Sequence, residues 1–176
     1  MSETNHVIVI GAGAAGMLAA IAAAGEGAEV ELWEQNEKPG KKLFITGKGR
    51  CNVTNACDME ELLGSVVSNS KFLYSSFYGF TNQDMMDLLE QAGLRLKVER
   101  GNRVFPASDK SIDIIHALFF ELKRLNVTMT TWQRVSSVTL KDGAVSGVEI
   151  GTAGDKWGWR EPCKAVILAT GGLSYP

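Results

Sequence analysis

The chain has few cysteines, little net charge and no long apolar run, and each of these shortages excludes a class of protein. Its three cysteines, Cys51, Cys57 and Cys163, are an odd number without C-x-x-C spacing, which argues against the disulfide framework of a secreted domain and favours the reducing cytoplasm. A net charge of −2 gives no attraction for nucleic acid or an acidic membrane surface, and we expect neither as a partner. No apolar run approaches the length of a transmembrane helix. With 45% hydrophobic and 22% charged residues among 176, the composition is that of a globular domain with a sizeable core.

Glycine is plentiful, and three glycines follow the first apolar run at a diagnostic spacing. Residues 11–16 read Gly-Ala-Gly-Ala-Ala-Gly and are followed by an alanine-rich stretch. A strand, a glycine turn and a helix in this order form the cradle that holds the phosphates of a dinucleotide. Gly11 permits the tight turn, Gly13 lets the backbone approach a pyrophosphate, and Gly16 lets the helix lie close to the strand. Glu34 ends the second strand, 18 residues after Gly16, and is placed to accept a hydrogen bond from a ribose hydroxyl.

The spacing of apolar residues predicts an α/β fold, a Rossmann-like domain with a central parallel sheet and an antiparallel β-meander. The expected strands lie near residues 6–10, 29–34, 94–105, 127–133 and 165–168, and the expected helices near 14–26, 58–92 and 110–125. The meander occupies about 135–161, with turns at Asp142-Gly143 and around Gly154-Asp155. Asn82 is the expected cap of a helix that Gly93 ends, and Ser108 or Asp109 is the expected cap of the helix near 110–125.

The polar stretch 35–57 is predicted to be a long functional loop, because a loop of this length is ordered only by something that it holds. Its glycines let backbone N–H groups approach a ligand, and its positive charge comes from Lys41, Lys42, Lys48 and Arg50. Cations and backbone donors stabilise the anionic reduced form of a flavin, so the loop favours FAD over NAD. A solvated basic loop is the alternative interpretation.

Two further features favour FAD. One is the turn Ala169–Gly172, which follows the meander, and the other is the strand entering Val135, whose backbone is suited to pair with the edge of adenine. The position of Cys51 beside Arg50 is compatible with a redox thiol, but without a C-x-x-C partner we interpret it as a packing residue next to the flavin. Neither histidine has partners at ligand spacing, so we expect no metal site, and we assign no catalytic residue.

Four segments of the sequence resemble the bacterial BaiN-like flavoproteins, which are NAD(P)/FAD-dependent oxidoreductases of the type with two dinucleotide-binding domains. The segments are Val9–Gly16, Lys41–Asn55, Arg103–Lys110 and Ile167–Pro176. The resemblance implies FAD at the glycine cradle, with the loop from Lys41 to Asn52 along the ribityl and isoalloxazine parts. The cofactor-binding residues that we expect are Gly11, Gly13, Ala14, Ala15, Gly16, Glu34, Gln35, Lys41, Lys42, Thr46, Gly49, Arg50, Cys51, Asn52, Val135, Ala169, Thr170 and Gly171.

The resemblance also implies a reaction. NAD(P)H would reduce the flavin at N5, and the reduced flavin would pass electrons to a small organic acceptor, which is a steroid-type enone in some relatives. Family members continue beyond the segment that ends at Pro176 with a substrate-side domain and the rest of the flavin domain. We therefore expect residues 1–176 to be the N-terminal portion of an FAD-binding domain, incomplete at its C-terminus. A non-catalytic FAD-binding fragment and an NAD-binding dehydrogenase domain remain alternatives, and the sequence leaves the oligomeric state open.

Overall fold

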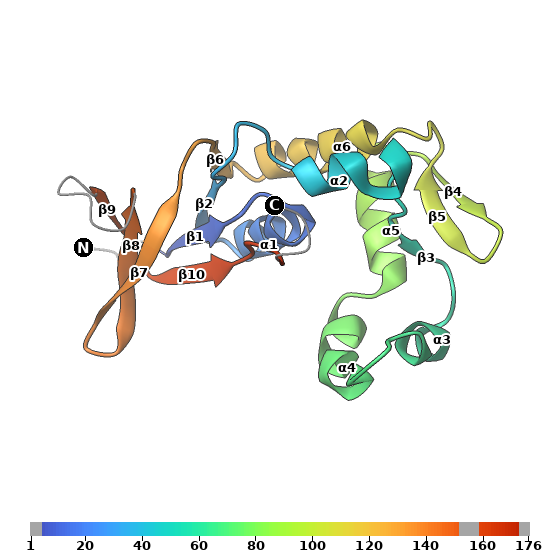
Figure 1. Ribbon diagram of the computed structural model, residues 1–176, viewed down its shortest axis with the longest axis horizontal. Helices are drawn as coiled ribbons and strands as arrows, with labels where there is room; N and C mark the ends of the chain where they lie inside the picture. The colour runs from blue at the N-terminus through green and yellow to red at the C-terminus, as the bar shows by residue number, and fades with distance from the viewer. Residues whose placement is uncertain (1–4, 152–158, 173–176) are drawn as a thin grey trace. The chain divides into compact units, whose positions relative to one another are not determined.

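A computed structural model describes residues 5–151 and 159–172, and the chain divides into two units (Figure 1). The first unit holds the residues up to Lys42 and those from Phe119 onward, and the second runs from Leu43 to Leu118. The chain passes from one unit to the other within helix α2 (Lys41–Ile45) and again within helix α6 (Ser111–Arg124). In the described ranges, no helix combines the length and the apolar content that crossing a membrane requires.

The first unit is built on a parallel sheet of four strands in the order β10-β1-β2-β6. The strands are β1 (His6–Ile10), β2 (Glu29–Trp33), β6 (Thr128–Thr130) and β10 (Ala165–Leu168). Ile8 of β1 is paired with Glu31 on one side and with Val166 on the other. A central parallel strand is covered on both faces, which is why β1 is a continuous apolar run. The predicted Rossmann-like parallel sheet is confirmed.

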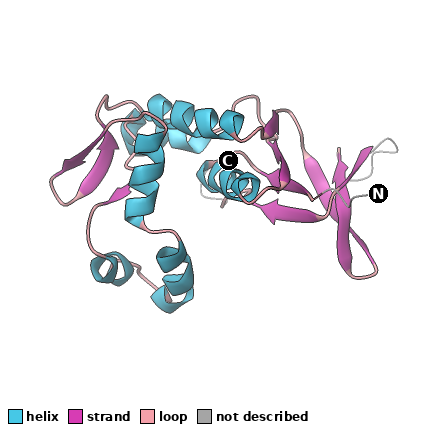
Figure 2. Ribbon diagram, turned by 180° about the vertical axis from the view of Figure 1, so that it is seen from behind, coloured by secondary structure: helices cyan, strands magenta, loops and turns pink. Residues whose placement is uncertain are grey.

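Helix α1 (Ala14–Gly25) and the meander supply the cover on the two faces of this sheet. Successive residues of a strand point to opposite faces, and Ile8 and Ile10 pack in one cluster with Val148 of the meander. The intervening residues of β1 therefore face the other side, where α1 buries Met17 and Ala20. Figure 2 shows α1, in cyan, beside the strands of the parallel sheet.

The meander consists of β7 (Val135–Lys141), β8 (Ala144–Ile150) and β9 (Trp159–Pro162), all antiparallel. Its first turn lies at Asp142 and Gly143, where both residues have a left-handed backbone, with φ of +53° and +81°. This conformation matches the two-residue hairpin turns that suit the twist of antiparallel strands. The second predicted turn, around Gly154 and Asp155, lies outside the described residues, as do residues 173–176 of the last resemblance segment.

The second unit contains an antiparallel sheet in the order β3-β5-β4 and three helices. The elements are β3 (Thr54–Asn55), α3 (Met59–Gly64), α4 (Ser70–Gly79), α5 (Asn82–Gln91), β4 (Leu96–Glu99) and β5 (Arg103–Pro106). Central strand β5 buries Val104, which is paired with Thr54 on one side and with Val98 on the other. The predicted helical stretch 58–92 is therefore divided into three helices and the predicted strand region 94–105 into two strands, whereas β3 lies in the predicted loop.

The predicted loop 35–57 is more ordered than expected. It contains α2, a tight turn over Thr46–Gly49 with a left-handed backbone at Gly47 and Lys48, and the short strand β3. The end of α2 is held by tertiary structure, because the Ser111 hydroxyl donates to the Phe44 carbonyl at 2.7 Å. A partner 67 residues away leaves no local signal in the sequence, so the polar composition alone predicted a loop.

The predicted helix caps were partly wrong. Thr81, not Asn82, caps α5: its hydroxyl accepts from the Asp84 N–H, and the Asp84 carboxylate accepts from the Thr81 N–H. This is a capping box, whereas the Asn82 side chain donates to the carbonyls of Asn55 and Cys57. Asp109 does not cap α6 either, since its carboxylate accepts hydrogen bonds from side chains elsewhere in the second unit.

Loss of the capping box has a measurable cost. We expect Thr81→Ala to lower the free energy of unfolding by about 1 kcal/mol, because the first turn of α5 loses its side-chain acceptor. Glu90→Ala, at an exposed position of the same helix, should change it by less than about 0.5 kcal/mol. Urea unfolding followed by circular dichroism measures both. Equal effects of the two substitutions would contradict the assignment of the cap.

Candidate functional site

The glycine turn after β1 leaves no room for side chains at two of its three glycines. Gly11 has φ of +103°, and its N–H donates to the Trp33 carbonyl at 2.7 Å. A Cβ on Gly11 would lie 2.5 Å from the Ala169 carbonyl oxygen, and one on Gly16 would lie 1.7 Å from the Gly11 carbonyl oxygen. Helix α1 therefore starts in direct contact with the turn, and the end of β10 closes over it.

Gly13 differs from both of these glycines. Its φ of −82° suits any residue, and an added Cβ would meet nothing within 4 Å among the described residues. The protein's own packing thus gives no reason for glycine here. A ligand that approaches the backbone closely does give one, and a pyrophosphate is the group for which the cradle is suited. The space beside Gly13 is the observation that fits this cradle to a dinucleotide.

The first turn of α1 supplies the donors. No side chain in the described part of the chain caps this helix, and its first turn carries no acidic residue. The N–H groups of Ala14, Ala15 and Gly16 have no partner within the helix, because the i→i−4 ladder starts only with the Met17 N–H, which donates to the Gly13 carbonyl at 3.0 Å. Free N–H groups and the positive end of the helix dipole together favour an anion.

Glu34 is held rigidly beside the cradle. Its side chain is only 8% exposed, and Oε2 accepts from the Ala12 N–H at 2.9 Å. Oε1 accepts from both the backbone N–H and the side-chain amide of Asn36, at 2.9 and 2.6 Å. Carboxylate oxygens have lone pairs for further donors, so ribose hydroxyls have acceptors here. Sequence reasoning identified Glu34 but missed Asn36, which orients it.

Two other predicted segments reach the same end of the sheet. The Ala169 N–H donates to the Ile10 carbonyl at 2.9 Å, which places the turn Ala169–Gly172 next to the cradle. The Lys42 ammonium donates to the Gly172 carbonyl at 2.9 Å, and it lies 3.5 Å from where a Cβ on Gly171 would be. The structure therefore brings together the cradle, Lys42 and the turn after β10.

The segment that leads to Val135 is also tied to this site. The Gln133 N–H donates to the Glu34 carbonyl at 2.8 Å, and the Glu34 N–H donates to the Thr130 carbonyl at 2.9 Å. Val135 follows as the first residue of β7, paired with Ile150. The contact of Val135 with adenine remains a prediction, as does the contact of Gln35, which is exposed.

These features identify the family. The protein-family model described as "HI0933-like protein Rossmann domain" matches residues 5–176 of the sequence. The chain belongs to this family. The chain is a Rossmann domain of the FAD-binding kind found in flavoprotein oxidoreductases, and a flavocytochrome c3 fumarate reductase is among the solved structures that it resembles. The resemblance to BaiN-like flavoproteins is thereby confirmed.

Two curated relatives and one solved structure illustrate the likeness. The chain is 35% identical over 174 residues to "Ribosomal RNA dihydrouridine synthase" of Escherichia coli, covering 99% of this chain and 41% of the relative. It is 37% identical over 172 residues to "3-dehydro-bile acid delta(4,6)-reductase" of Clostridium scindens, covering 96% and 39%. The open conformation of a flavocytochrome c3 fumarate reductase matches with a TM-score of 0.67 and 26% identity, over 97% of this chain and 34% of that one. The chain thus spans about two fifths of the length of these curated relatives.

The second segment of this HI0933-like domain with a predicted cofactor role is the loop Thr46–Asn52, which lies in the second unit. Four of its residues have a left-handed backbone: Gly47, Lys48, Gly49 and Cys51, with φ of +60°, +58°, +85° and +56°. For Lys48 and Cys51 this conformation costs about 1–2 kcal/mol each, because a Cβ crowds the carbonyl. Within the loop, the Cys51 N–H donates to the Thr46 carbonyl at 3.0 Å and the Arg50 N–H to the Gly47 carbonyl at 3.3 Å.

Arg50 is bound to protein carboxylates. Its Nε donates to Oδ1 of Asp109 at 2.8 Å, and its Nη2 lies 2.5 Å from both Asp109 Oδ1 and Glu99 Oε1. The guanidinium carbon lies 4.2 Å from the centre of the Phe105 ring. Lys97 joins the group with its ammonium 2.7 Å from Asp109 Oδ2 and 3.4 Å from Glu99 Oε1. Arg50, one of the four cations expected near a flavin, is therefore paired with carboxylates of its own unit, and nothing in the sequence pointed to these partners.

These pairs shift the titration of the acids. The Lys97 ammonium and then the Arg50 guanidinium hold the pKa of Asp109 below its usual range. For Glu99 the order is reversed, with Arg50 the main cause of a lowered pKa. Both carboxyls gain their partners in the folded state, so both stabilise the fold more as anions than as acids.

Cys51 behaves as a packing residue. It is 2% exposed, and burial raises the pKa of its thiol, which disfavours the reactive thiolate. All three cysteines are free thiols. No cluster of three or more His, Cys, Asp or Glu side chains suited to a metal ion occurs among the described residues.

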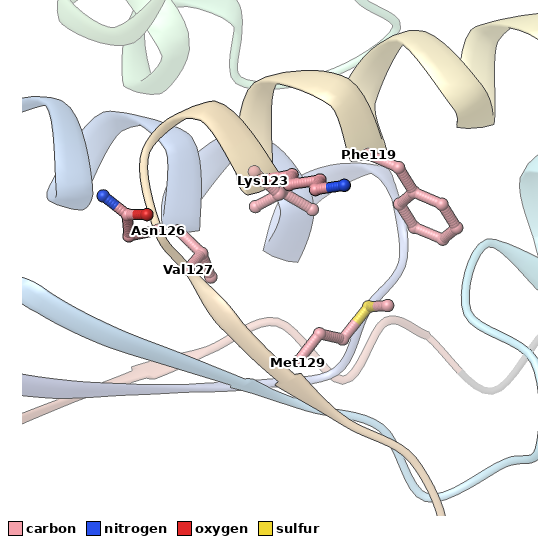
Figure 3. A pocket seen from close by; sticks show the side chains of 6 residues that line it. Phe119, Lys123, Asn126, Val127 and Met129 are labelled. Carbon is pink, nitrogen blue, oxygen red and sulfur yellow. The ribbon is translucent and has the colours of Figure 1, made fainter.

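A cavity of about 370 Å³ lies elsewhere in the first unit and shares no residue with the cradle. It is lined by Phe119, Leu122, Lys123, Asn126, Val127 and Met129. Figure 3 shows Phe119 of α6 and Met129 of β6 facing the same space, with the Lys123 ammonium beside Phe119. The lining is mostly apolar and carries no acid or nucleophile, so we assign it no part in the flavin site.

The ion pairs of Asp109 predict a pH dependence. Because the folded pKa of Asp109 is lowered, its contribution to stability is present above the unfolded pKa of about 4 and is lost as the pH falls through the folded value. Asp109→Asn keeps the shape and suits the left-handed backbone at this position, where φ is +60°. We expect this variant to be less stable than the wild type at pH 6 and to show a smaller deficit at pH 2.5, as measured by urea unfolding.

Glu90→Gln is the control for this measurement. It removes one carboxylate from an exposed position of α5. The difference in stability between Glu90→Gln and the wild type should be small at both pH values. If the deficit of Asp109→Asn persisted unchanged at pH 2.5, the ion pairs would not be its cause.

Proposed function

We propose that this chain is the FAD-binding part of an NAD(P)H-dependent reductase whose acceptor is a small organic molecule with a carbon–carbon double bond conjugated to a carbonyl group. The observation that carries FAD binding is the open space beside Gly13, which lies between two glycines that packing requires. The three cysteines, all free thiols, support a reducing, cytoplasmic setting.

The acceptor class is supported by what the two relatives are named for. One is a synthase of dihydrouridine in ribosomal RNA, and the other is a delta(4,6)-reductase of a 3-dehydro bile acid. Both names denote the addition of hydrogen to a ring double bond. The net charge of −2 favours a small molecule over RNA, because RNA binding is driven largely by cationic side chains that neutralise phosphates.

The division of labour follows from the site. When bound, FAD supplies the hydride transfer from NAD(P)H to the acceptor. The N–H groups of Ala14, Ala15 and Gly16 would hold the pyrophosphate, and the fixed carboxylate of Glu34 would hold the ribose hydroxyls. Lys42, beside the turn Ala169–Gly172, would place a cation near the dinucleotide. The chain thus binds and orients the cofactor.

A pair of glycine variants tests the binding site. Gly13→Ala should lower the free energy of unfolding by only about 1 kcal/mol, because alanine is a poorer N-cap but meets no protein atom. It should weaken FAD binding at least tenfold, since the new methyl group occupies the space for phosphate. Quenching of flavin fluorescence during titration measures the dissociation constant.

Gly25→Ala is the matched control at the other end of α1. An added Cβ at Gly25 meets nothing within 4 Å among the described residues, so the change adds the same methyl group to the same helix. FAD affinity should stay within twofold of the wild type. Equal FAD affinity of Gly13→Ala and the wild type would place the phosphates elsewhere.

The reaction is tested by the visible spectrum. The purified chain with FAD should show flavin absorbance that is bleached by NADH or NADPH under anaerobic conditions. In a protein in which this domain is joined to a substrate-side domain, the colour should return on addition of a steroid enone and not on addition of uridine-containing RNA. A bound flavin that neither nucleotide bleaches would contradict the NAD(P)H link while leaving FAD binding in place, and a chain that takes up no FAD would contradict both.

A further inference from the structure

Two of the segments that resemble BaiN-like flavoproteins meet in the second unit. One contains Arg50, and the other is Arg103–Lys110, for which the sequence indicated no chemistry. We propose that Arg50 is a positioning residue: Asp109, Glu99 and Phe105 hold its guanidinium and thereby fix the loop Thr46–Asn52 in the conformation that binds FAD. The proposal rests on the proposed function, because it assigns a role toward the same cofactor.

The first step of the argument is the geometry of the guanidinium. Nε and Nη2 both reach Oδ1 of Asp109, at 2.8 and 2.5 Å, and Nη2 also reaches Glu99. One face of the group is stacked 4.2 Å from the centre of the Phe105 ring. Partners thus come from β4, from β5 and from the segment before α6. A planar group held at its edge and on its face has one orientation.

The second step is the charge balance. Arg50 and Lys97 carry two positive charges, and Glu99 and Asp109 carry two negative charges, all linked by the contacts described above. The group is neutral as a whole, so Arg50 offers little net field to an anionic cofactor. By contrast, Lys48 is exposed and pairs with no carboxylate among the residues that the structure describes. The same loop therefore has a cation suited to electrostatic attraction and a second one used for anchoring.

The third step is that the loop needs an anchor. Arg50 lies between Gly49 and Cys51, which both have a left-handed backbone, and Lys48 before them has one too. Such residues persist only where surrounding structure holds them. Besides the backbone bonds inside the loop, the Val53 N–H donates to the Val104 carbonyl at 2.9 Å, at the exit of the loop. The Arg50 side chain anchors the loop at its centre.

The segment Arg103–Lys110 acquires a function in this way. It supplies the Phe105 ring and the Asp109 carboxylate. Asp109 has a left-handed backbone of its own, with φ of +60°, and its N–H donates to the Pro106 carbonyl at 3.0 Å. The turn after β5 thus places the Asp109 carboxylate beside Arg50, and the two segments hold each other in place.

Opposite charges give the decisive test. FAD is anionic, so if Arg50 attracted it directly, Arg50→Gln would weaken binding, whereas Asp109→Asn, which removes a competing negative charge, would strengthen it. If Arg50 positions the loop, both substitutions weaken binding, because both release the same anchor. We expect a loss of at least tenfold in FAD affinity for each single variant. The FAD affinity of the double variant, Arg50→Gln with Asp109→Asn, should be at most threefold lower than that of the weaker-binding single variant.

A measurement without FAD separates this proposal from the proposed function. Amide hydrogen exchange at residues 47–52 should be at least tenfold faster in Arg50→Gln and in Asp109→Asn than in the wild type. Glu90→Gln removes one negative charge from an exposed position of the same unit and should change neither exchange in the loop nor FAD affinity by more than twofold. If the wild type bound no FAD, the proposed function would fail, and the exchange data would still show whether the anchor exists.

Several outcomes would overturn the proposal. FAD binding by Asp109→Asn that is as tight as that of the wild type would make Arg50 a direct cation or a bystander. Unchanged exchange in the loop of Arg50→Gln would show that the side chain anchors nothing. If circular dichroism shows that Arg50→Gln or Asp109→Asn is unfolded, Glu99→Gln is the milder substitute. It should give the same faster amide exchange in the loop and a loss of at least threefold in FAD affinity. Arg50→Lys should recover part of the affinity, because an ammonium keeps one ion pair but loses the stacking.

Discussion

The nucleotide site depends on a contact that tolerates no side chain, where α1 meets the end of β1 and the turn after β10. A Cβ at Gly16 would overlap the Gly11 carbonyl, and a Cβ at Gly11 would overlap the Ala169 carbonyl. This contact sets where α1 begins and therefore where its unpaired N–H groups point. It also brings the turn Ala169–Gly172, which comes from the far end of the chain, to the same place. The positions of α1, of strands β1 and β10, and of the free N–H groups of α1 therefore depend on one another.

The glycine-rich segments of the two units are held in different ways. In the cradle, backbone is exposed because side chains are missing, and the conformation is maintained by the sheet and by α1. In the loop Thr46–Asn52, non-glycine residues take left-handed conformations, and ion pairs and an aromatic ring hold them. The first solution depends mainly on close packing of backbone atoms. The second depends on carboxylates that keep their charge, so it is the more sensitive to conditions.

The elements of this fold that could be predicted are those with local patterns. The run of apolar residues in β1, the glycine spacing at 11–16 and the alternation in β7 and β8 each have a physical period, and the parallel sheet and the meander follow from them. The predictions that failed concerned features that depend on residues distant in the sequence. The helical turn α2 depends on Ser111, and the role of Arg50 depends on Glu99 and Asp109, 49 and 59 residues away. A run of basic residues looks the same in sequence whether its charges are paired or not.

On the proposed function, the way Glu34 is held would select among nucleotides. Its carboxylate is fixed by Ala12 and Asn36, so it cannot swing away from a ligand that carries a negative charge at the adenosine ribose. A ribose with free hydroxyls would find acceptors there, whereas a ribose with a 2′-phosphate would place its phosphate oxygens against side-chain oxygens that themselves accept hydrogen bonds. The hydrogen bonds from Ala12 and Asn36 would thus favour one class of dinucleotide over the 2′-phosphorylated class, and they are present in the protein without a ligand.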